Sequence, residues 1–148
     1  MVAGDFVLPR DPQRPVLLIA AGIGITPFVS HLASGAPRER NAVLLVLARS
    51  RDELAYADEL RNSGGRVLVW LADGSEPPPG LACAAVGSGP GGSAARGQLD
   101  GDALTALVPD IGGRDVYVSG SPGSVASIRR AARSAGARRI RTDSFSGY

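Results

Sequence analysis

The sequence predicts an α/β fold, a doubly wound, mostly parallel five-stranded sheet with helices on both faces. Short apolar runs alternate with segments of helical spacing along the 148 residues. Two of the apolar runs end in glycine turns that lead directly into a helix start. The length and the 44% hydrophobic content suit one domain that buries a substantial core.

The first predicted strand and the turn after it form the most informative stretch of the chain. Val16 to Ala20 is apolar throughout, as in a strand that is buried on both faces. The turn reads Gly22-Ile23-Gly24-Ile25-Thr26-Pro27, with Thr26 as helix N-cap and Pro27 at the first helical position. The free N–H groups and the dipole of such a helix start favour an anion, and the glycines let a phosphate approach the backbone. This stretch predicts the first half of a dinucleotide site, although it lacks the third glycine of the G-x-G-x-x-G fingerprint.

A second turn of the same design supports this interpretation. Val116 to Ser119 is the predicted fourth strand, and it runs into Ser119-Gly120-Ser121-Pro122, where a hydroxyl residue and a proline again begin a helix. Ser121 has two open roles, as a ligand contact or simply as the helix N-cap. Because ligands bind at the carboxyl ends of parallel strands, we expect both turns to converge on one ligand.

The remaining elements follow from apolar spacing and from capping residues. The stretch from Ala72 to Gly97 is rich in Gly, Pro and Ser, has no clear period, and is expected to be a long loop that contains Cys83. In the last helix, inward spacing is predicted for Val125, Ile128 and Ala132 and solvent exposure for Arg129, Arg130 and Arg133. We expect four helices: Thr26 to about Ser34, the capping box Ser50–Glu53 to Gly64, Asp100 to Leu107 with Asp100 as its cap, and Pro122 to Ala135 before Gly136. The other expected strands are Ala42 to Ala48, Arg66 to Leu71 and Arg138 to Arg141.

The composition excludes several classes of function. All 16 basic residues are arginine, the net charge is +2, and aromatic residues make up 5%. Since the arginines do not cluster along the chain as nucleic-acid binders require, no nucleic-acid partner is expected. The single cysteine excludes an internal disulfide and a cysteine-based metal or iron–sulfur site within the chain. No signal peptide is evident and the longest apolar run, Val16 to Ile25, is about half a membrane span, so we expect a cytoplasmic protein without direct membrane insertion.

Three motifs, in order, carry a resemblance to a known family. G-I-G-I-T-P after V-L-L-I-A, V-Y-V-S-G-S-P-G, and the terminal T-D-S-F-S-G-Y resemble the pyridine-nucleotide domain of ferredoxin–NADP reductase-like flavoproteins. The resemblance covers essentially the whole chain. The segment Gly4-Asp5-Phe6-Val7-Leu8-Pro9 also resembles the last strand of the flavin barrel that precedes this domain. The resemblance therefore implies that residues 1–10 are a remnant of such a barrel and that residues 11–148 form an NAD(P)-binding domain.

The resemblance also implies a role for each motif. Gly22–Pro27 binds the pyrophosphate, and Thr26 lies near the junction of nicotinamide and flavin. Ser119 occupies a position where relatives have cysteine or serine, beside the nicotinamide, with Gly120–Pro122 completing that turn. Phe145 in the tail lies near the flavin ring, where it must make room for the nicotinamide. Thr26, Ser119 and Phe145 are therefore the residues expected at the reacting rings.

The residues after the second strand bear on the choice of coenzyme. Dinucleotide sites contact the adenosine ribose at this place, where an acidic residue holds a 2′-hydroxyl and repels a 2′-phosphate. Here the sequence has Arg49, Ser50 and Arg51, and arginines form charge-assisted hydrogen bonds to a 2′-phosphate. The triplet favours NADPH over NADH, although Ser50 is also explained as a helix cap and Asp52 and Glu53 lie next to it.

These features together predict the nicotinamide-dinucleotide-binding half of a flavin-dependent NAD(P)H oxidoreductase. Hydride would pass from NAD(P)H to FAD or FMN, and the electrons then to an acceptor that leaves no trace in the sequence. The flavin-phosphate motif of Arg-x-Tyr-Ser type is absent, so the flavin barrel is expected as a missing N-terminal part or a separate chain, and the isolated chain is expected to be incomplete as an enzyme. The alternative is a non-catalytic dinucleotide-binding or regulatory module. A methyltransferase-like domain is disfavoured by the second turn and the aromatic tail.

Overall fold

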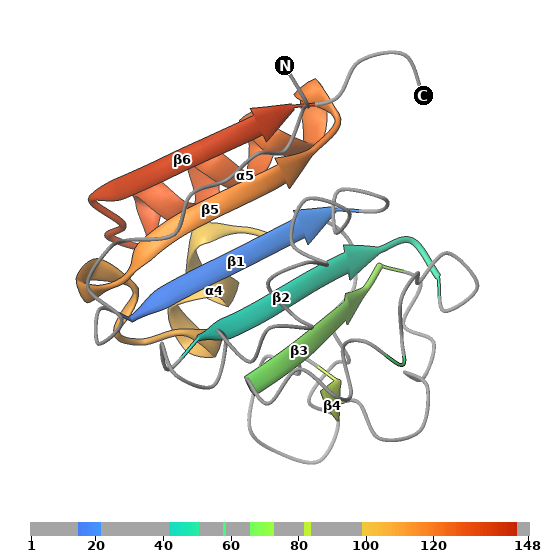
Figure 1. Cartoon of the computed structure of the whole chain (residues 1–148), viewed down its shortest axis with the longest axis horizontal. Helices are drawn as coiled ribbons and strands as arrows, with labels where there is room; N and C mark the ends of the chain where they lie inside the picture. The colour runs from blue at the N-terminus through green and yellow to red at the C-terminus, as the bar shows by residue number, and fades with distance from the viewer. Residues whose placement is uncertain are drawn as a thin grey trace.

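The structure is a computed structural model that describes residues 15–21, 42–50, 58, 66–72, 82–83 and 99–144. Within these residues, six parallel strands form one sheet in the order β4-β3-β2-β1-β5-β6 (Figure 1). The strands are β1 (Val16–Ala21), β2 (Val43–Ala48), β3 (Arg66–Leu71), β4 (Ala82–Cys83), β5 (Asp115–Gly120) and β6 (Arg139–Ser144); the helices are α4 (Gly101–Leu107), the 3-10 helix η3 (Ile111–Gly113) and α5 (Pro122–Ser134).

The predicted α/β fold and its five strands are confirmed, with two corrections. β6 continues to Ser144 instead of ending at Arg141, because it pairs with β5 along the whole length of that strand. The expectation that Cys83 lies in a loop is wrong, because Ala82 and Cys83 form the short strand β4 and pair with Leu68 and Val69 of β3. A strand of two residues is too short to show a period, so the sequence pattern misses it.

The order of the strands reverses between β1 and β5. From β1 the chain adds β2, β3 and β4 on one side, and it then returns to add β5 and β6 on the other side of β1. The register pairs Ala20 with Ser119, so the last residues of β1 and β5 lie side by side. The carboxyl ends of these two strands therefore form the switch point at which open α/β sheets bind ligands.

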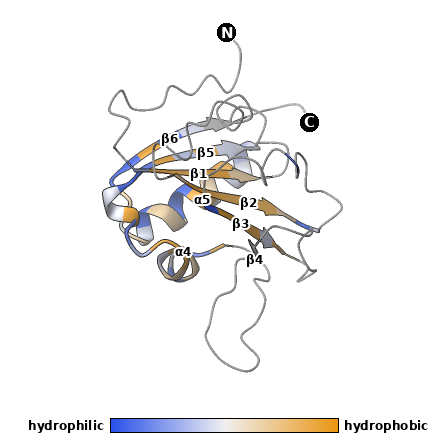
Figure 2. Cartoon of the chain, turned by 60° about the horizontal axis from the view of Figure 1, so that its bottom comes forward, coloured by the Kyte–Doolittle hydropathy of each residue, from blue (hydrophilic) through white to orange (hydrophobic). Residues whose placement is uncertain are grey.

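Apolar side chains cover both faces of the sheet, as a doubly wound fold requires. On the face that packs against α4 and α5, Leu17, Ile19 and Val118 are buried with Val125 and Ile128 of α5. The other face carries a second buried layer, and Figure 2 shows β1, β2 and β3 as strongly hydrophobic ribbons. The second layer includes Val16, Leu18, Ala20, Leu44, Val46, Val69 and Tyr117.

Short-range capping interactions set the ends of the helices as predicted. Asp100 caps α4, its Oδ1 accepting a hydrogen bond from the N–H of Ala103 at 2.8 Å. Ser121 is the N-cap of α5, with Pro122 in the first turn. Gly136, with φ at 102°, lies two residues beyond the end of α5 in the left-handed region that favours glycine.

Arg114 is a buried charged residue that the sequence pattern does not single out. Its side chain is 7% exposed. Its Nη1 donates to the carbonyl of Val16 at 3.0 Å, and its Nε donates to Oδ1 of Asp110 at 3.0 Å. The hydrogen bond from Arg114 holds the pKa of Asp110 below its usual value. Arg114 thus ties the turn after η3 to the beginning of β1.

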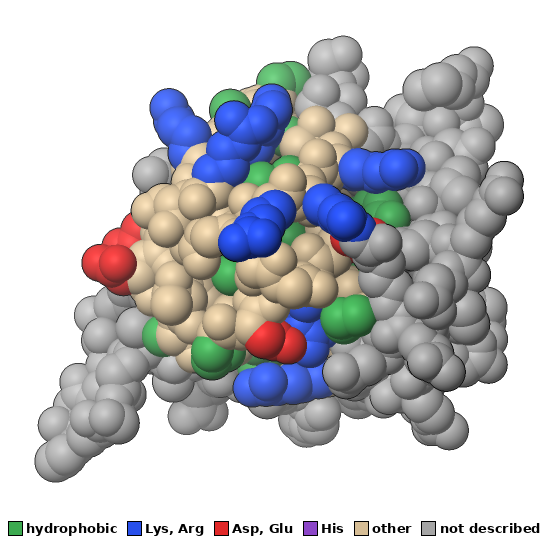
Figure 3. Space-filling model, turned by 90° about the vertical axis from the view of Figure 1, so that its left-hand side faces the viewer, with side chains coloured by type: hydrophobic (Ala, Val, Ile, Leu, Met, Phe, Trp, Pro, Cys, Tyr) green, Lys and Arg blue, Asp and Glu red, His purple; other side chains and the backbone are tan. Residues whose placement is uncertain are grey.

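Exposed arginines gather on one side of the molecule, a feature that the sequence pattern does not single out. The described arginines of α5 and β6 are exposed, and Figure 3 shows arginine side chains gathered over the upper part of that side of the molecule. No acidic residue interrupts the chain between the first and the last of them. We call this group the arginine surface, and its members are Arg129, Arg130, Arg133, Arg138, Arg139 and Arg141.

The contact between α4 and α5 gives a test of the packing. A Cβ added at Gly101 would lie 2.5 Å from Oγ and 2.7 Å from Cβ of Ser134, so we expect Gly101→Ala to destabilise the protein by about 1–2 kcal/mol. The matched control is Gly123→Ala in α5, where an added Cβ meets no atom within 4 Å and the better helix propensity of alanine should raise stability slightly. Urea unfolding monitored by circular dichroism measures both changes, and equal effects of the two substitutions would contradict this packing.

Candidate functional site

The candidate site lies at the edge of the sheet that is formed by the carboxyl ends of the strands. Figure 1 shows the arrowheads of β1, β2, β3, β5 and β6 along this edge. At the switch point, the end of β1 at Ala21 lies beside Gly120 of β5. Two of the predicted site segments, Arg49–Ser50 and Ser119–Pro122, are described by the structure, and both lie at this edge. The expected convergence of the Ser119–Pro122 turn with Gly22–Pro27 stays a prediction, because Gly22–Pro27 lies outside the described residues.

Ser119 is the polar side chain buried at the end of β5. It is 0% exposed, and its Oγ has no hydrogen-bond partner among the described residues. Side chains alternate along a strand, so Ser119 lies on the same face as Tyr117, opposite to the face covered by α5. A buried hydroxyl without a partner costs free energy, whereas a polar ligand atom brought to it would satisfy it. Ser119 is the described residue whose environment most favours a ligand contact.

Gly120 is required by the close approach of two strand ends. A Cβ added at Gly120 would lie 3.1 Å from the Cβ of Ala21 and 3.4 Å from its carbonyl oxygen. The neighbouring strand must therefore shift by a few tenths of an ångström to accept any side chain at this place. At this place the two strand ends meet through the hydrogen of Gly120 and the methyl group of Ala21, which lets the ends of β1 and β5 lie close together.

Ser121 and Pro122 begin α5 directly after this glycine. The Oγ of Ser121 accepts a hydrogen bond from the N–H of Ser124 at 3.3 Å and donates to the Oγ of Ser124 at 3.0 Å. Of the two roles left open by the sequence, the N-cap is the one that the structure shows. The start of α5 thus points its first N–H groups toward the same edge of the sheet as Ser119.

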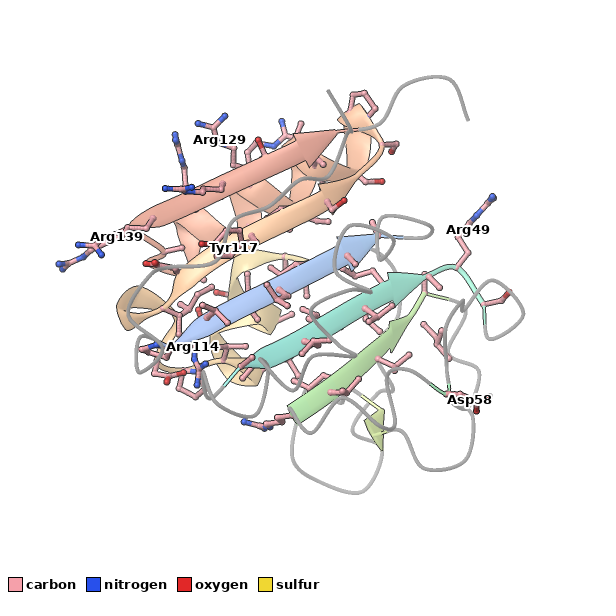
Figure 4. The ribbon with its side chains drawn as sticks, in the orientation of Figure 1. Arg49, Asp58, Arg114, Tyr117, Arg129 and Arg139 are labelled. Carbon is pink, nitrogen blue, oxygen red and sulfur yellow. The ribbon has the colours of Figure 1, made fainter. Side chains whose placement is uncertain are left out.

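Arg49 and Ser50 follow β2, which is the neighbour of β1 on the side away from β5. The side chain of Arg49 is exposed and extends beyond the end of β2 (Figure 4), and Ser50 is half-buried. Their position relative to the switch point is the one expected for residues that contact the adenosine end of a dinucleotide. The other predicted site residues lie outside the described residues: Gly22, Ile23, Gly24, Ile25, Thr26, Pro27, Arg51 and Phe145.

The described part of the chain shows neither a metal site nor a membrane-spanning helix. No group of three or more His, Cys, Asp or Glu side chains suited to a metal ion occurs among the described residues. Likewise, none of the helices described there has the length and hydropathy needed to cross a membrane.

Known proteins resemble this chain in sequence and in fold. No family model matches the chain. The chain is 30% identical over 131 residues to a flavohemoprotein of Pseudomonas aeruginosa, a match that covers 86% of this chain and 30% of the relative. It is also 30% identical over 122 residues to the ferredoxin–NAD(+) reductase component of the alkene monooxygenase system of Xanthobacter autotrophicus, which covers 79% of this chain and 34% of that protein. The chain thus spans about a third of the length of these curated relatives.

A solved structure shows the same fold. The flavohem-like FAD/NAD binding domain of nitric oxide dioxygenase from Vibrio cholerae matches with a TM-score of 0.68 and 23% identity, over 95% of this chain and 54% of that one. The sequence relatives and the fold agree with the three motifs that carry the resemblance. The chain is thus similar over most of its length to ferredoxin–NADP reductase-like flavoproteins, and its fold is that of their pyridine-nucleotide domain.

Proposed function

We propose that this chain binds NAD(P)H at the carboxyl edge of its sheet and presents the nicotinamide to a flavin held by another domain. The observation that carries the proposal is the buried, unpartnered hydroxyl of Ser119 beside the switch point between β1 and β5. The relatives support it, because they include a flavohemoprotein and a ferredoxin–NAD(+) reductase component. When bound, the flavin supplies the hydride acceptor, and the protein supplies position and orientation.

Each part of the site has a distinct task in this proposal. Gly22–Pro27 holds the pyrophosphate at the end of β1, and Arg49 with Arg51 holds a 2′-phosphate on the adenosine ribose. Ser119 bonds a polar atom of the nicotinamide group and so fixes the rotation of the ring. Phe145 would lie near the flavin ring and would have to make room for the nicotinamide. None of these tasks needs an acid or a base, since the reaction moves a hydride between two cofactors.

The flavin barrel itself is provided either by a segment that precedes this domain or by a separate chain. The lengths of the relatives favour a larger parent protein, because these relatives are about three times as long as the part that this chain matches. The flavin then passes electrons to an acceptor whose nature differs among the relatives, as their names indicate. For this chain we assign the reductase role and leave the acceptor open.

Isothermal titration calorimetry with NADP⁺ and NAD⁺ tests the proposal. We expect NADP⁺ to bind more tightly, and we expect Arg49→Ala or Arg51→Ala to weaken NADP⁺ binding by about tenfold or more while NAD⁺ binding stays the same, because a charge-assisted hydrogen bond to phosphate is lost. Arg133→Ala, in the last turn of α5, removes the same charge elsewhere and should change neither affinity. A cooperatively folded chain that binds neither dinucleotide would contradict the proposal.

A further inference from the structure

The outer strand β6 leaves one edge of the sheet without a neighbouring strand in the described part of the chain. β6 pairs with β5 on one side and is the last strand in the sheet order. From Arg139 to Thr142 its side chains are exposed except for Ile140, which packs toward the core. An exposed edge presents unpaired N–H and C=O groups, which form a template for an added strand.

The charge of the arginine surface is poorly balanced. Among the described residues one ion pair reaches it, between Nη1 of Arg139 and Oδ1 of Asp115 at 3.7 Å, and the Arg139 side chain remains 62% exposed. Arg129 and Arg133 stand four residues apart on α5, a spacing at which like charges repel and weaken a helix. Arg133 gains from the dipole at the helix C-terminus, but Arg129 lies too far from that end to benefit. Such a local conflict is expected where a surface serves binding.

The arginine surface lies apart from the candidate nucleotide site. Figure 4 shows Arg139 at one end of the sheet, at the start of β6, and Arg49 beyond the opposite end. Arg139 begins β6, whereas the candidate site lies at the carboxyl ends of the strands. Binding of a dinucleotide therefore does not explain these arginines.

The geometry of β6 indicates the chemistry of a partner. Arg139 and Arg141 are two residues apart in a strand, so they project on the same face about 7 Å from each other, which is the spacing of alternate side chains in an extended peptide. Arginine binds carboxylates with paired hydrogen bonds. Among the described residues of α5 and β6, the exposed side chains include no aromatic residue for stacking bases and no large apolar residue for insertion into lipid. These features favour a polypeptide over a nucleic acid or a membrane.

We propose that the edge of β6 is a docking site for an acidic, extended segment of a partner protein, which adds to the sheet as a further strand. The backbone of the segment pairs with β6, and its alternate Asp or Glu side chains bond Arg139 and Arg141. Arg129, Arg130 and Arg133, which lie on α5 on the other face of the sheet, add to the positive potential at this edge and speed the encounter. This docking site is independent of the dinucleotide site at the other end of the strands.

Binding of a fluorescent peptide, acetyl-(Glu-Thr)₄-amide, to the 148-residue chain tests the proposal by anisotropy. We expect saturable binding that weakens with added salt, and a loss of about tenfold for Arg141→Gln. Arg66→Gln removes one exposed arginine at the start of β3 and should leave the affinity unchanged. NADP⁺ binding by Arg141→Gln should equal that of the wild type, which separates this site from the proposed coenzyme site.

Two further probes decide between pairing and simple charge attraction. A peptide of the same sequence with alternate backbone amides N-methylated keeps its charge but cannot form a strand ladder, and we expect it not to bind. Equal binding of the methylated peptide, or no binding of the unmodified one, would overturn the proposal. Tighter, Arg141-dependent binding of oligouridylate, a short DNA duplex or phosphatidylserine vesicles would overturn it in favour of a different class of partner.

Discussion

Replacing Arg114 by methionine is expected to lower the free energy of unfolding by about 3 kcal/mol. Methionine fills much of the same volume, so the loss comes mainly from polar interactions. The Nη1 bond to the Val16 carbonyl is buried, and removing a charged donor leaves that carbonyl without this partner in an apolar layer. The carbonyl lies at the beginning of β1, which is the strand between β2 and β5. Loss of its hydrogen bond therefore affects the pairing of β1 with both neighbouring strands. Urea unfolding measures the change directly.

A matched control separates the loss of the buried hydrogen bonds of Arg114 from the effect of replacing any arginine by methionine. Arg130→Met on the exposed side of α5 makes the same chemical change without a buried hydrogen bond, and it should alter stability by less than about 0.5 kcal/mol. A loss for Arg114→Met no larger than that of the control would contradict a structural role for the buried guanidinium.

The effect of Arg114→Met on the free energy of unfolding should depend on pH, and the direction follows from the pKa of Asp110. The folded state holds the pKa of Asp110 below its unfolded value of about 3.9, so the ionised carboxylate stabilises the protein above that value and the stabilisation is lost as the pH falls through the folded pKa. The stability gap between wild type and Arg114→Met should therefore narrow below about pH 4. The narrowing should be small, because the Asp110 side chain is 63% exposed and solvent screens the pair.

Local patterns in the sequence predict most of the sheet and the helix ends. Arg66–Leu71 has the predicted bounds, and the caps at Asp100 and Ser121 follow from side chains that bond the backbone within three residues. The two-residue strand β4 and the burial of Arg114 depend on partners that are far away in the sequence. Propensity and periodicity contain no information about such contacts, so these features emerge only with the tertiary structure.

The same distinction applies to the site and to the arginine surface. The turn after β5 is predictable because glycine, serine and proline each have a local reason to be there. The close approach of Gly120 to Ala21 is not predictable from the sequence, since it depends on the register of β1 against β5. The arginine surface combines a helix with the strand that follows it. Because α5 packs against Ile140 of β6, Arg139 and Arg141, which alternate with Ile140, project on the face opposite to α5. A count of charges along the chain cannot show this.

Replacing Ser119 by alanine is expected to raise stability by about 1 kcal/mol while it weakens coenzyme binding. The gain in stability arises because the hydroxyl is fully buried without a partner in the part of the chain that the structure describes, whereas water satisfies it in the unfolded chain. Ser121→Ala is the matched control, two residues away. There the lost hydroxyl accepts a bond from the N–H of Ser124, so the same chemical change should lower stability by about 1 kcal/mol.

The binding measurement for Ser119→Ala uses two ligands that differ in the nicotinamide part. NADP⁺ should bind about fivefold more weakly to the variant, as expected for the loss of one neutral hydrogen bond, while 2′,5′-ADP, which lacks the nicotinamide, should bind as it does to the wild type. A gain in stability with no change for either ligand would make the buried hydroxyl a packing defect without a role in binding. Equal weakening for both ligands would place Ser119 at the adenosine end and contradict its assignment beside the nicotinamide. If the Ser119 hydroxyl lowers the stability of the free protein but strengthens binding of the nicotinamide part of the ligand, its role is in binding and not in folding.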